Sequence, residues 1–275
     1  MVKRAIATVT GVALSALLAA STYAAIDSGS IAGAWLFDEA SGDVAGDSSS
    51  NGNDGMFNGG VEWVDGPNGN SGSAVRFDGS GWVAIPDSDS LDMGDSLSVM
   101  FWFRSEKAMV DMWGDRQVVV GKHYEEYEVG IYLDAQIHTY SSDQAGAYDE
   151  GIMATFNGLL PGGEADWIQG EWYHVAWTLD GAHEVAYVNG VMLGEYDKGH
   201  AGTLGGDHEL NVGQRTGGGL NVTGSVDEVA IFNVALGEAD VVMAYEDGLG
   251  TAIGIITAVQ PEGKLAATWG ALKSR

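Results

Sequence analysis

The sequence predicts an all-β protein, a two-sheet antiparallel β-sandwich with one short helix near the C-terminus. Short runs of β-branched and aromatic residues alternate with polar turn clusters at intervals of roughly ten residues, which is typical of a sandwich or jelly roll. Glycine is abundant, with 42 residues, and proline is scarce, with 4 residues. We find no internal repeat, so neither a propeller nor a solenoid is expected.

The expected strands are apolar or alternating segments bounded by turn residues. In residues 172–179, the odd-numbered positions form one apolar face, as in a strand with one side in a core. The expected strands are residues 31–38, 73–77, 81–85, 97–105, 117–122, 128–133, 152–156, 172–179, 184–188, 208–212 and 224–233.

Two further local signals predict a hairpin and a helix. Asn189-Gly190 separates two expected strands, and this pair favours the type I′ turn of a two-residue β-hairpin. The short helix is expected at residues 236–247, where apolar residues recur at helical spacing. Residues 47–55 are rich in Ser, Asn, Asp and Gly, and four polar side chains are expected to organise this loop: Asp47, Asn51, Asn53 and Asp54.

The N-terminal segment has the features of a secretory signal peptide. Lys3 and Arg4 precede an apolar stretch of ~15 residues, and Thr22 and Ala24 suit a cleavage site. The stretch is shorter than the ~20 residues that span a bilayer. We expect cleavage after Ala24, no membrane span, and a secreted or cell-surface location. The expected organisation is a signal peptide at 1–24, one domain at 26–250 and a C-terminal hairpin or tail at 251–275.

The chain is strongly acidic, with 39 Asp and Glu residues, 12 Lys and Arg residues and a net charge of −27. Nucleic acids and anionic lipids bind basic patches, so nucleic acid is not an expected partner. The sequence contains no cysteine, which excludes disulfides and thiolate metal sites. The acidic residues serve solubility in one interpretation and bind divalent cations in another, and the sequence leaves both open.

Six motifs, taken together, resemble bacterial secreted LamG-like jelly-roll domains, which have the concanavalin A-like lectin/glucanase fold. They follow the family's order from about residue 31 to residue 245. The resemblance implies two packed antiparallel sheets, a carbohydrate-binding, adhesive or accessory role, and in some members one structural Ca²⁺. The motifs are Trp35-Leu36-Phe37-Asp38-Glu39 with Asp47 to Gly55, Val75-Arg76-Phe77-Asp78-Gly79-Ser80, Val83-Ala84-Ile85-Pro86-Asp87, Gly170-Glu171-Trp172-Tyr173-His174-Val175-Ala176, Tyr187-Val188-Asn189-Gly190, and the segment Gly224 to Leu236.

The resemblance suggests a calcium site where the first strand meets the last. Asp38 and Asp227 lie on those expected strands, and Asp78 precedes a glycine in an early turn. Calcium is bound by six to eight oxygen atoms, from carboxylates, carbonyls and water. In the alternative interpretation, these three aspartates cap turns and tie strand ends.

No catalytic motif is present, and we expect no enzymatic activity. Glycoside hydrolases use two carboxylates about 5–9.5 Å apart, and the resemblance implies that hydrolases of this fold carry them in a Glu-x-Asp-x-(x)-Glu strand. The nearest run, Glu125-Glu126-Tyr127-Glu128, does not match that motif. The sequence also has no Gly-x-Ser-x-Gly and no His-Glu-x-x-His. A glycoside hydrolase is the least favoured alternative.

Glycan binding is the leading functional hypothesis, because sugars stack on exposed aromatic rings. The stretch from residue 106 to 163 departs from the family, and its extra residues are not expected to be needed for the sandwich. Four aromatic residues in or beside predicted loops are the expected glycan contacts, with ordinary packing as the alternative: Trp113, Tyr124, Tyr148 and Trp167. Four other tryptophans are expected in the core: Trp35, Trp102, Trp172 and Trp177.

The expected function is therefore a secreted, non-catalytic carbohydrate-binding or adhesive module. Its expected partner is a glycan or cell-surface polysaccharide, and its expected cofactor is a structural Ca²⁺. The second hypothesis is a structural cell-surface protein that self-associates.

Overall fold

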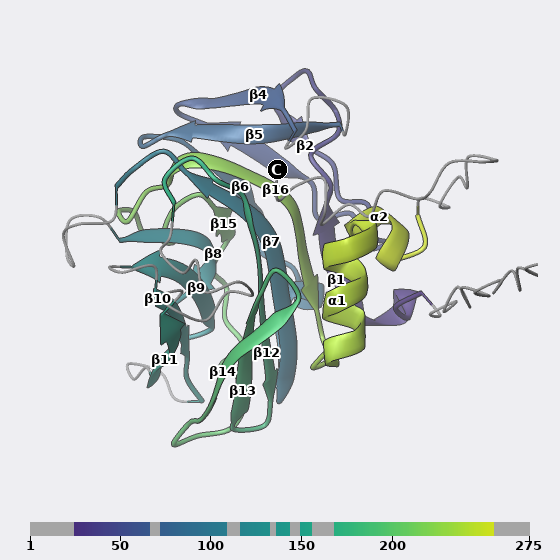
Figure 1. Ribbon diagram of the computed structural model, residues 1–275, viewed down its shortest axis with the longest axis vertical. Helices are drawn as coiled ribbons and strands as arrows, with labels where there is room; N and C mark the ends of the chain where they lie inside the picture. The colour runs from purple at the N-terminus through teal and green to yellow at the C-terminus, as the bar shows by residue number, and fades with distance from the viewer. Residues whose placement is uncertain are drawn as a thin grey trace, which may run out of the picture.

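The computed structural model describes residues 25–66, 72–108, 116–132, 136–143, 149–155 and 168–255. Two antiparallel sheets pack face to face, and the helices α1 (Glu238–Asp247) and α2 (Leu249–Ala252) lie against the outer face of the first sheet (Figure 1). The predicted two-sheet sandwich with a short C-terminal helix is confirmed.

The first sheet carries the helices. Its strands, in spatial order, are β14 (Val191–Asp197), β13 (His183–Val188), β12 (Tyr173–Asp180), β7 (Ser96–Ser105), β16 (Thr223–Phe232), β5 (Ser73–Asp78) and β4 (Val61–Asp65), and β1 (Ile31–Trp35) also pairs with β16.

The second sheet forms the other layer. Its strands, in spatial order, are β11 (Asp149–Thr155), β10 (Gln136–Ser141), β9 (Tyr127–Tyr132), β8 (Gln117–His123), β15 (Leu210–Val212), β6 (Trp82–Ile85), β3 (Gly55–Asn58) and β2 (Val44–Ala45). Two 3₁₀ turns, η1 (Ser28–Ser30) and η2 (Asp89–Leu91), complete the described elements.

Every expected strand overlaps an observed one, but several observed strands were not expected. The first strand ends at Trp35 rather than residue 38, because Phe37 has a left-handed backbone with φ of 55°. The strands that sequence analysis missed are β2, β3, β4, β10 and β14. They are very short, lie near a sheet edge, or carry polar residues at their buried positions, so periodicity does not mark them.

The core between the sheets is built from inward-facing aromatic and aliphatic residues. Trp35 and Trp177 are 0% exposed and lie in this core. Trp102 and Trp172, 1% and 7% exposed, are buried in a separate cluster with Ala74, so the expected burial of all four tryptophans is confirmed. The odd-numbered residues of β12 face the other sheet, as predicted. The even-numbered residue Ala176 is also buried, because α1 and α2 cover the outer face of this strand.

The stretch from residue 106 to 163 is part of the sandwich, and the expectation that it is dispensable was wrong. Four strands of the second sheet, β8 to β11, lie in this stretch. Val120, Val129, Ile131 and Ile137 are fully or almost fully buried in the core between the sheets. Alternation along β9 sends one face of that strand inward, so the sandwich requires these residues.

The predicted turns are confirmed. Asn189 and Gly190 both have positive φ, 50° and 75°, as a type I′ turn requires. In the loop of residues 47–55, the Asp47 carboxylate accepts hydrogen bonds from the backbone N–H groups of Ser49 at 2.8 Å and Asn53 at 2.8 Å. The loop therefore holds its own shape, as expected of these polar side chains.

The predicted helix is also confirmed, and it begins at Glu238. The Asp240 carboxylate accepts a hydrogen bond from the Gly237 N–H at 3.3 Å, which caps the first turn. Val241 and Ala244 pack against the first sheet. None of the helices in the described part of the chain is long and apolar enough to cross a membrane. The expected signal peptide, and residues 256–275 of the expected tail, lie outside the described residues.

Candidate functional site

Tyr124 is the one expected glycan contact that the structure describes. Trp113, Tyr148 and Trp167 lie outside the described residues. Tyr124 is half-buried in the turn that joins β8 to β9. The candidate site consists of this turn and the residues around it.

Three neighbouring rings, Tyr124, His123 and His208, form a stack that we call the ring platform. The ring centroids of Tyr124 and His123 are 4.2 Å apart, and those of His123 and His208 are 4.1 Å apart with an angle of 3° between their planes. His123 ends β8 and His208 precedes β15, and these two strands are neighbours in the second sheet. The side chain of His208 is 45% exposed, so the platform reaches solvent.

A buried lysine supports the platform from inside the protein. The side chain of Lys122 is 0% exposed, and its Nζ lies 2.9 Å from Asp87, 2.8 Å from Glu126 and in hydrogen-bond contact with Asp92. Burial alone would lower the pKa of Lys122, but hydrogen bonds to these three carboxylates outweigh it and raise the pKa well above the ordinary value. Lys122 is therefore a permanent cation.

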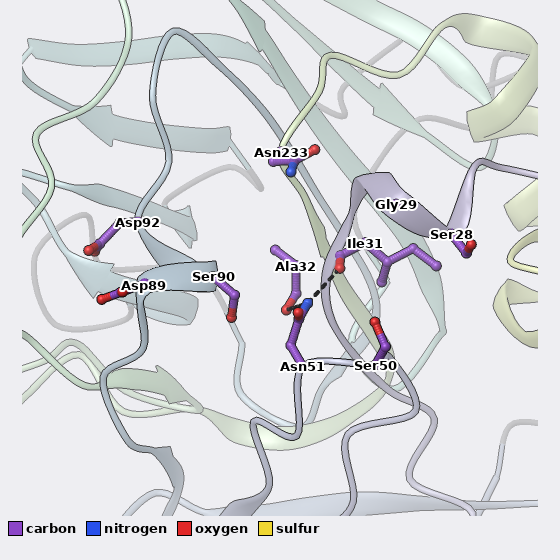
Figure 2. A pocket seen from close by; sticks show the side chains of 10 residues that line it. All are labelled: Ser28, Gly29, Ile31, Ala32, Ser50, Asn51, Asp89, Ser90, Asp92 and Asn233. Carbon is purple, nitrogen blue, oxygen red and sulfur yellow. Dashed lines mark hydrogen bonds between the residues drawn. The ribbon is translucent and has the colours of Figure 1, made fainter.

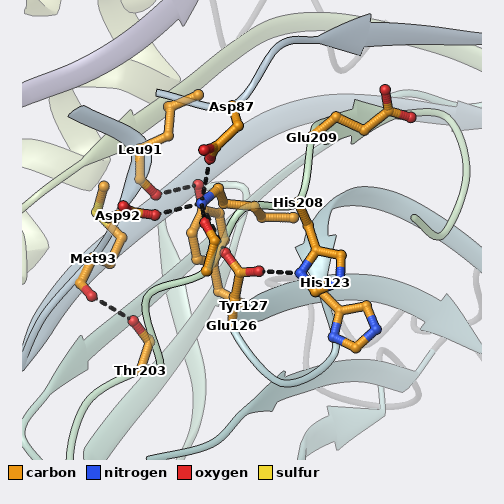
Figure 3. A network of polar contacts seen from close by, with 12 residues as sticks. Asp87, Leu91, Asp92, Met93, His123, Glu126, Tyr127, Thr203, His208 and Glu209 are labelled. Atoms are coloured by element: carbon orange, nitrogen blue, oxygen red, sulfur yellow. Dashed lines mark hydrogen bonds and ion pairs between the residues drawn. The ribbon is translucent and has the colours of Figure 1, made fainter. Parts of the chain in front are cut away.

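Glu126 connects this buried charge to the platform. One carboxylate oxygen of Glu126 pairs with Lys122. The other contacts Nδ1 of His208 (Figure 3). His208 lies in the connection between β14 and β15. A hydrogen bond from the Thr203 hydroxyl to the Met93 carbonyl, at 2.8 Å, anchors this connection. These contacts fix the orientation of the His208 ring.

A second charge pair lies on the outer face of the same sheet. Arg215 Nε donates to Glu128 Oε2 at 2.9 Å, and the Glu128 side chain is 0% exposed. The guanidinium of Arg215 lies 5.7 Å from the ring centroid of Tyr124 and 5.4 Å from that of Tyr140. Because Glu128 already binds Arg215, this cation is neutralised within the protein.

The aromatic residues behind this pair are packed rather than exposed. Tyr132 and His138 stack with their ring centroids 4.0 Å apart. Tyr132 is 4% exposed, and His138 and Tyr140 are each 6% exposed. These rings therefore support Arg215 and the sheet, whereas the ring platform is partly exposed.

Sequence analysis identified Tyr124 but missed most of the other groups in the site. It assigned no role to His123, His208, Lys122 or Arg215. The expected strands at residues 117–122 and 208–212 each bring a histidine to the strand end. That signal could have identified the platform only if the pairing of β8 with β15 had been known.

The titration of two histidines follows from their surroundings. Burial, and to a lesser extent the nearby His208, lowers the pKa of His123. The hydrogen bond to Asp197 raises the pKa of the exposed His183. We expect NMR titration to place His123 below the ordinary value of about 6.5 for histidine and His183 above it.

The two shifts have opposite consequences for stability. The contribution of neutral His123 is lost as pH falls from about 6.5 toward its lowered pKa, whereas that of protonated His183 is lost as pH rises through its raised pKa. Asp197→Asn is the control, and it should lower the pKa of His183 without changing that of His123. Equal midpoints for the two histidines in the wild type would contradict this prediction.

The three aspartates expected to bind Ca²⁺ do not form one site. Asp78 is exposed and accepts hydrogen bonds from its own turn, from the Ser80 N–H at 2.9 Å and the Ser80 hydroxyl at 2.7 Å. Asp227 is 2% exposed, and Asp38 is exposed beyond the end of β1. Within the described ranges, no group of three or more His, Cys, Asp or Glu side chains could hold a metal ion. Calcium binding stays a prediction of the sequence.

A polar pocket of about 180 Å³ lies where β1 meets the end of β16 (Figure 2). Asn51 Nδ2 donates to the carbonyls of Ile31 at 2.8 Å and Ala32 at 2.9 Å and closes one wall. Neither Asp38 nor Asp227 lines this pocket, and none of its ten lining residues is aromatic. The pocket therefore has no ring surface on which a sugar could stack.

The fold and the polar, ring-bearing site define a lectin-like β-sandwich. The chain belongs to the concanavalin A-like lectin/glucanases superfamily, whose laminin G family model matches residues 77–242. A comparison with curated proteins found no match.

Three solved structures illustrate the likeness of fold. Domain 4 of AbnA, a GH43 extracellular arabinanase from Geobacillus stearothermophilus, in complex with arabinotriose, is 18% identical with a TM-score of 0.57, over 78% of this chain and 97% of that chain. The binding domain of Paraclostridial Mosquitocidal Protein 1 is 15% identical with a TM-score of 0.63, over 80% of this chain and 52% of that chain.

The binding domain of botulinum neurotoxin DC, in complex with SialylT, is 13% identical with a TM-score of 0.57, over 79% of this chain and 51% of that chain. The chain thus spans about half the length of the two toxin structures. At these identities, the similarity concerns the fold.

Proposed function

We propose that this protein is a secreted, non-catalytic carbohydrate-binding module that stacks a sugar on the ring platform. The observation that carries the proposal is the partly exposed stack of Tyr124, His123 and His208. Binding sites commonly combine such apolar surface with a few fixed polar groups. The ring nitrogens of the platform and the nearby Arg215 are polar groups of this kind.

Two of the carboxylates beside the platform, Glu126 and Glu128, favour binding over catalysis. Glu126 is 2% exposed and bound to Lys122 and His208, and Glu128 is 0% exposed and bound to Arg215. A glycosidase needs two carboxyl groups that flank the scissile bond of the sugar. Glu126 and Glu128 instead serve as internal counter-ions.

The structural neighbours support a glycan as the class of ligand. The arabinanase domain was solved with arabinotriose, and it is named as part of an extracellular enzyme. A module of the same fold with a partly exposed ring stack is suited to a similar type of ligand. An extracellular location also agrees with the signal peptide that the sequence predicts.

Replacing Tyr124 with alanine tests the proposal. We expect the affinity for a bound neutral oligosaccharide to fall about 5- to 150-fold, from a loss of about 1–3 kcal/mol by analogy with bases stacked on aromatic rings. Isothermal titration calorimetry with arabino-, xylo- and gluco-oligosaccharides measures this loss.

Tyr196→Ala is the matched control, because Tyr196 is an aromatic residue of β14, 42% exposed and outside the platform. It should leave affinity unchanged. Equal losses in both variants would count against the platform as the site. Release of shorter sugars by the wild-type protein would overturn the non-catalytic assignment.

A further inference from the structure

Asn211 is a buried amide on the outer face of the second sheet. Its neighbours in β15, Leu210 and Val212, point into the core between the sheets, so alternation turns Asn211 outward. Asn211 is 0% exposed, and neither its Nδ2 nor its Oδ1 has a hydrogen-bond partner. Buried polar side chains are nearly always hydrogen-bonded, because an unmade bond destabilises the fold. This amide is therefore held at the expense of stability.

The residues across the sheet from Asn211 are small, and an indole ring lies on the same sheet face. The partners of Asn211 across the sheet are Ala84 on β6 and Gly121 on β8. Trp82 lies two residues from Ala84 on the same face of β6, and its Nε1 is also buried without a hydrogen-bond partner. A ring and a free amide on one sheet face are the two elements with which proteins hold the apolar face and the hydroxyls of a sugar.

A glycine-rich turn lies beside the amide. The Thr216 hydroxyl lies within hydrogen-bond distance of the carbonyls of Gly121, at 2.9 Å, and Glu209, at 3.1 Å, which flank Asn211 across and along the sheet. The next three residues are glycines with φ between 86° and 99°. Such residues change conformation with little steric cost. Besides backbone hydrogen bonds, this turn is held on the sheet face by Thr216 and by Arg215.

We infer that Asn211 and Trp82 form a second sugar subsite, which the turn of residues 215–219 covers in the free protein. When the turn opens, the amide donates to one sugar hydroxyl and accepts from another. The subsite rests on the proposed function and extends it to an oligosaccharide that reaches from His208 to Asn211, three residues further along the chain. The sugar is neutral, because the chain has a net charge of −27 and Arg215 is already paired with Glu128.

Replacing Asn211 with leucine separates this role from a structural one. Leucine has the same branched skeleton without polar atoms. Because it removes two buried polar atoms that lack hydrogen-bond partners, the substitution should raise the melting temperature by several degrees. The same variant should bind the neutral oligosaccharide at least tenfold more weakly. Asn233→Leu, at an exposed amide beyond the end of β16, is the control and should not weaken binding.

Thr216→Val tests the cover. Valine keeps the shape of threonine but removes the hydroxyl that holds the turn, so opening becomes easier and affinity should rise about two- to tenfold. In the double variant with Asn211→Leu, this gain should disappear.

The outcomes distinguish the two proposals. Lower stability of Asn211→Leu would show that an ordered water satisfies the amide, and it would overturn the subsite. Unchanged affinity of Asn211→Leu, with Tyr124→Ala still weakened, would overturn the subsite alone. Failure of the wild type to bind any neutral oligosaccharide would overturn the proposed function, whereas the predicted rise in melting temperature is measured without a sugar.

Discussion

Lys122→Met is expected to lower the free energy of unfolding by about 3–5 kcal/mol, because it leaves the buried carboxylate of Glu126 without its counter-ion. The Lys122 side chain is 0% exposed, and Glu126 beside it is 2% exposed. Methionine fills a similar volume, so the loss reports charge rather than a cavity. The Lys122–Glu126–His208 contacts orient the platform, so oligosaccharide affinity should fall as well. Urea unfolding followed by tryptophan fluorescence measures the change in stability.

Two further variants identify the cause of this loss. Asp87→Asn removes a carboxylate that is 35% exposed, and it should cost about 1 kcal/mol or less. Adding Glu126→Gln to Lys122→Met removes the uncompensated charge and should restore part of the stability. A loss below about 1 kcal/mol for Lys122→Met would show that the buried network is not required. No recovery in the double variant would show that the unpaired charge of Glu126 does not cause the loss.

Trp177→Ala is the second variant with a large expected effect, a loss of about 3–5 kcal/mol in the free energy of unfolding. Trp177 is 0% exposed in the core between the sheets. Its Nε1 donates to Glu184 Oε2 at 2.8 Å, an oxygen that also accepts from the Thr139 hydroxyl at 2.9 Å. Alanine therefore removes a large ring and one of the donors to a fully buried carboxylate.

Trp177→Phe separates these two contributions. Phenylalanine retains most of the packing and removes the N–H donor, so we expect a loss of about 1–3 kcal/mol. Glu184 keeps its bond to Thr139 and its ion pair with Lys198 at 3.7 Å in this variant. Equal losses for the two substitutions would assign the whole effect to the hydrogen bond, and the cavity argument would be wrong.

Strand positions could be predicted where the signal is local. The odd-numbered residues of β12 were correctly assigned to the core, because alternation along one strand is written in adjacent residues. The turn at Asn189-Gly190 was predicted for the same reason, since φ preferences belong to single residues. Strand β10 was missed, because its buried residues include Thr139, whose hydroxyl donates to Glu184 from the other sheet.

The candidate site could be predicted only in part. Tyr124 stood out as an aromatic residue beside a turn, and it lies in the ring platform. Lys122 looks like an ordinary solvated lysine at a strand end, yet its side chain is 0% exposed. Its burial depends on Asp87 and Asp92, which approach from the connection between β6 and β7.

By itself, the sequence determined the all-β class, most of the strands, the hairpin turn and the C-terminal helix, because each depends on neighbouring residues. The tertiary structure alone decided which side chains meet. In the second sheet, β15 lies between β8 and β6, and this order places His208 on His123 and Asn211 beside Gly121. It also left Asp38, Asp78 and Asp227 outside any common metal centre. Strand order depends on the packing of the whole sandwich, so it leaves no periodic or local signal in the chain.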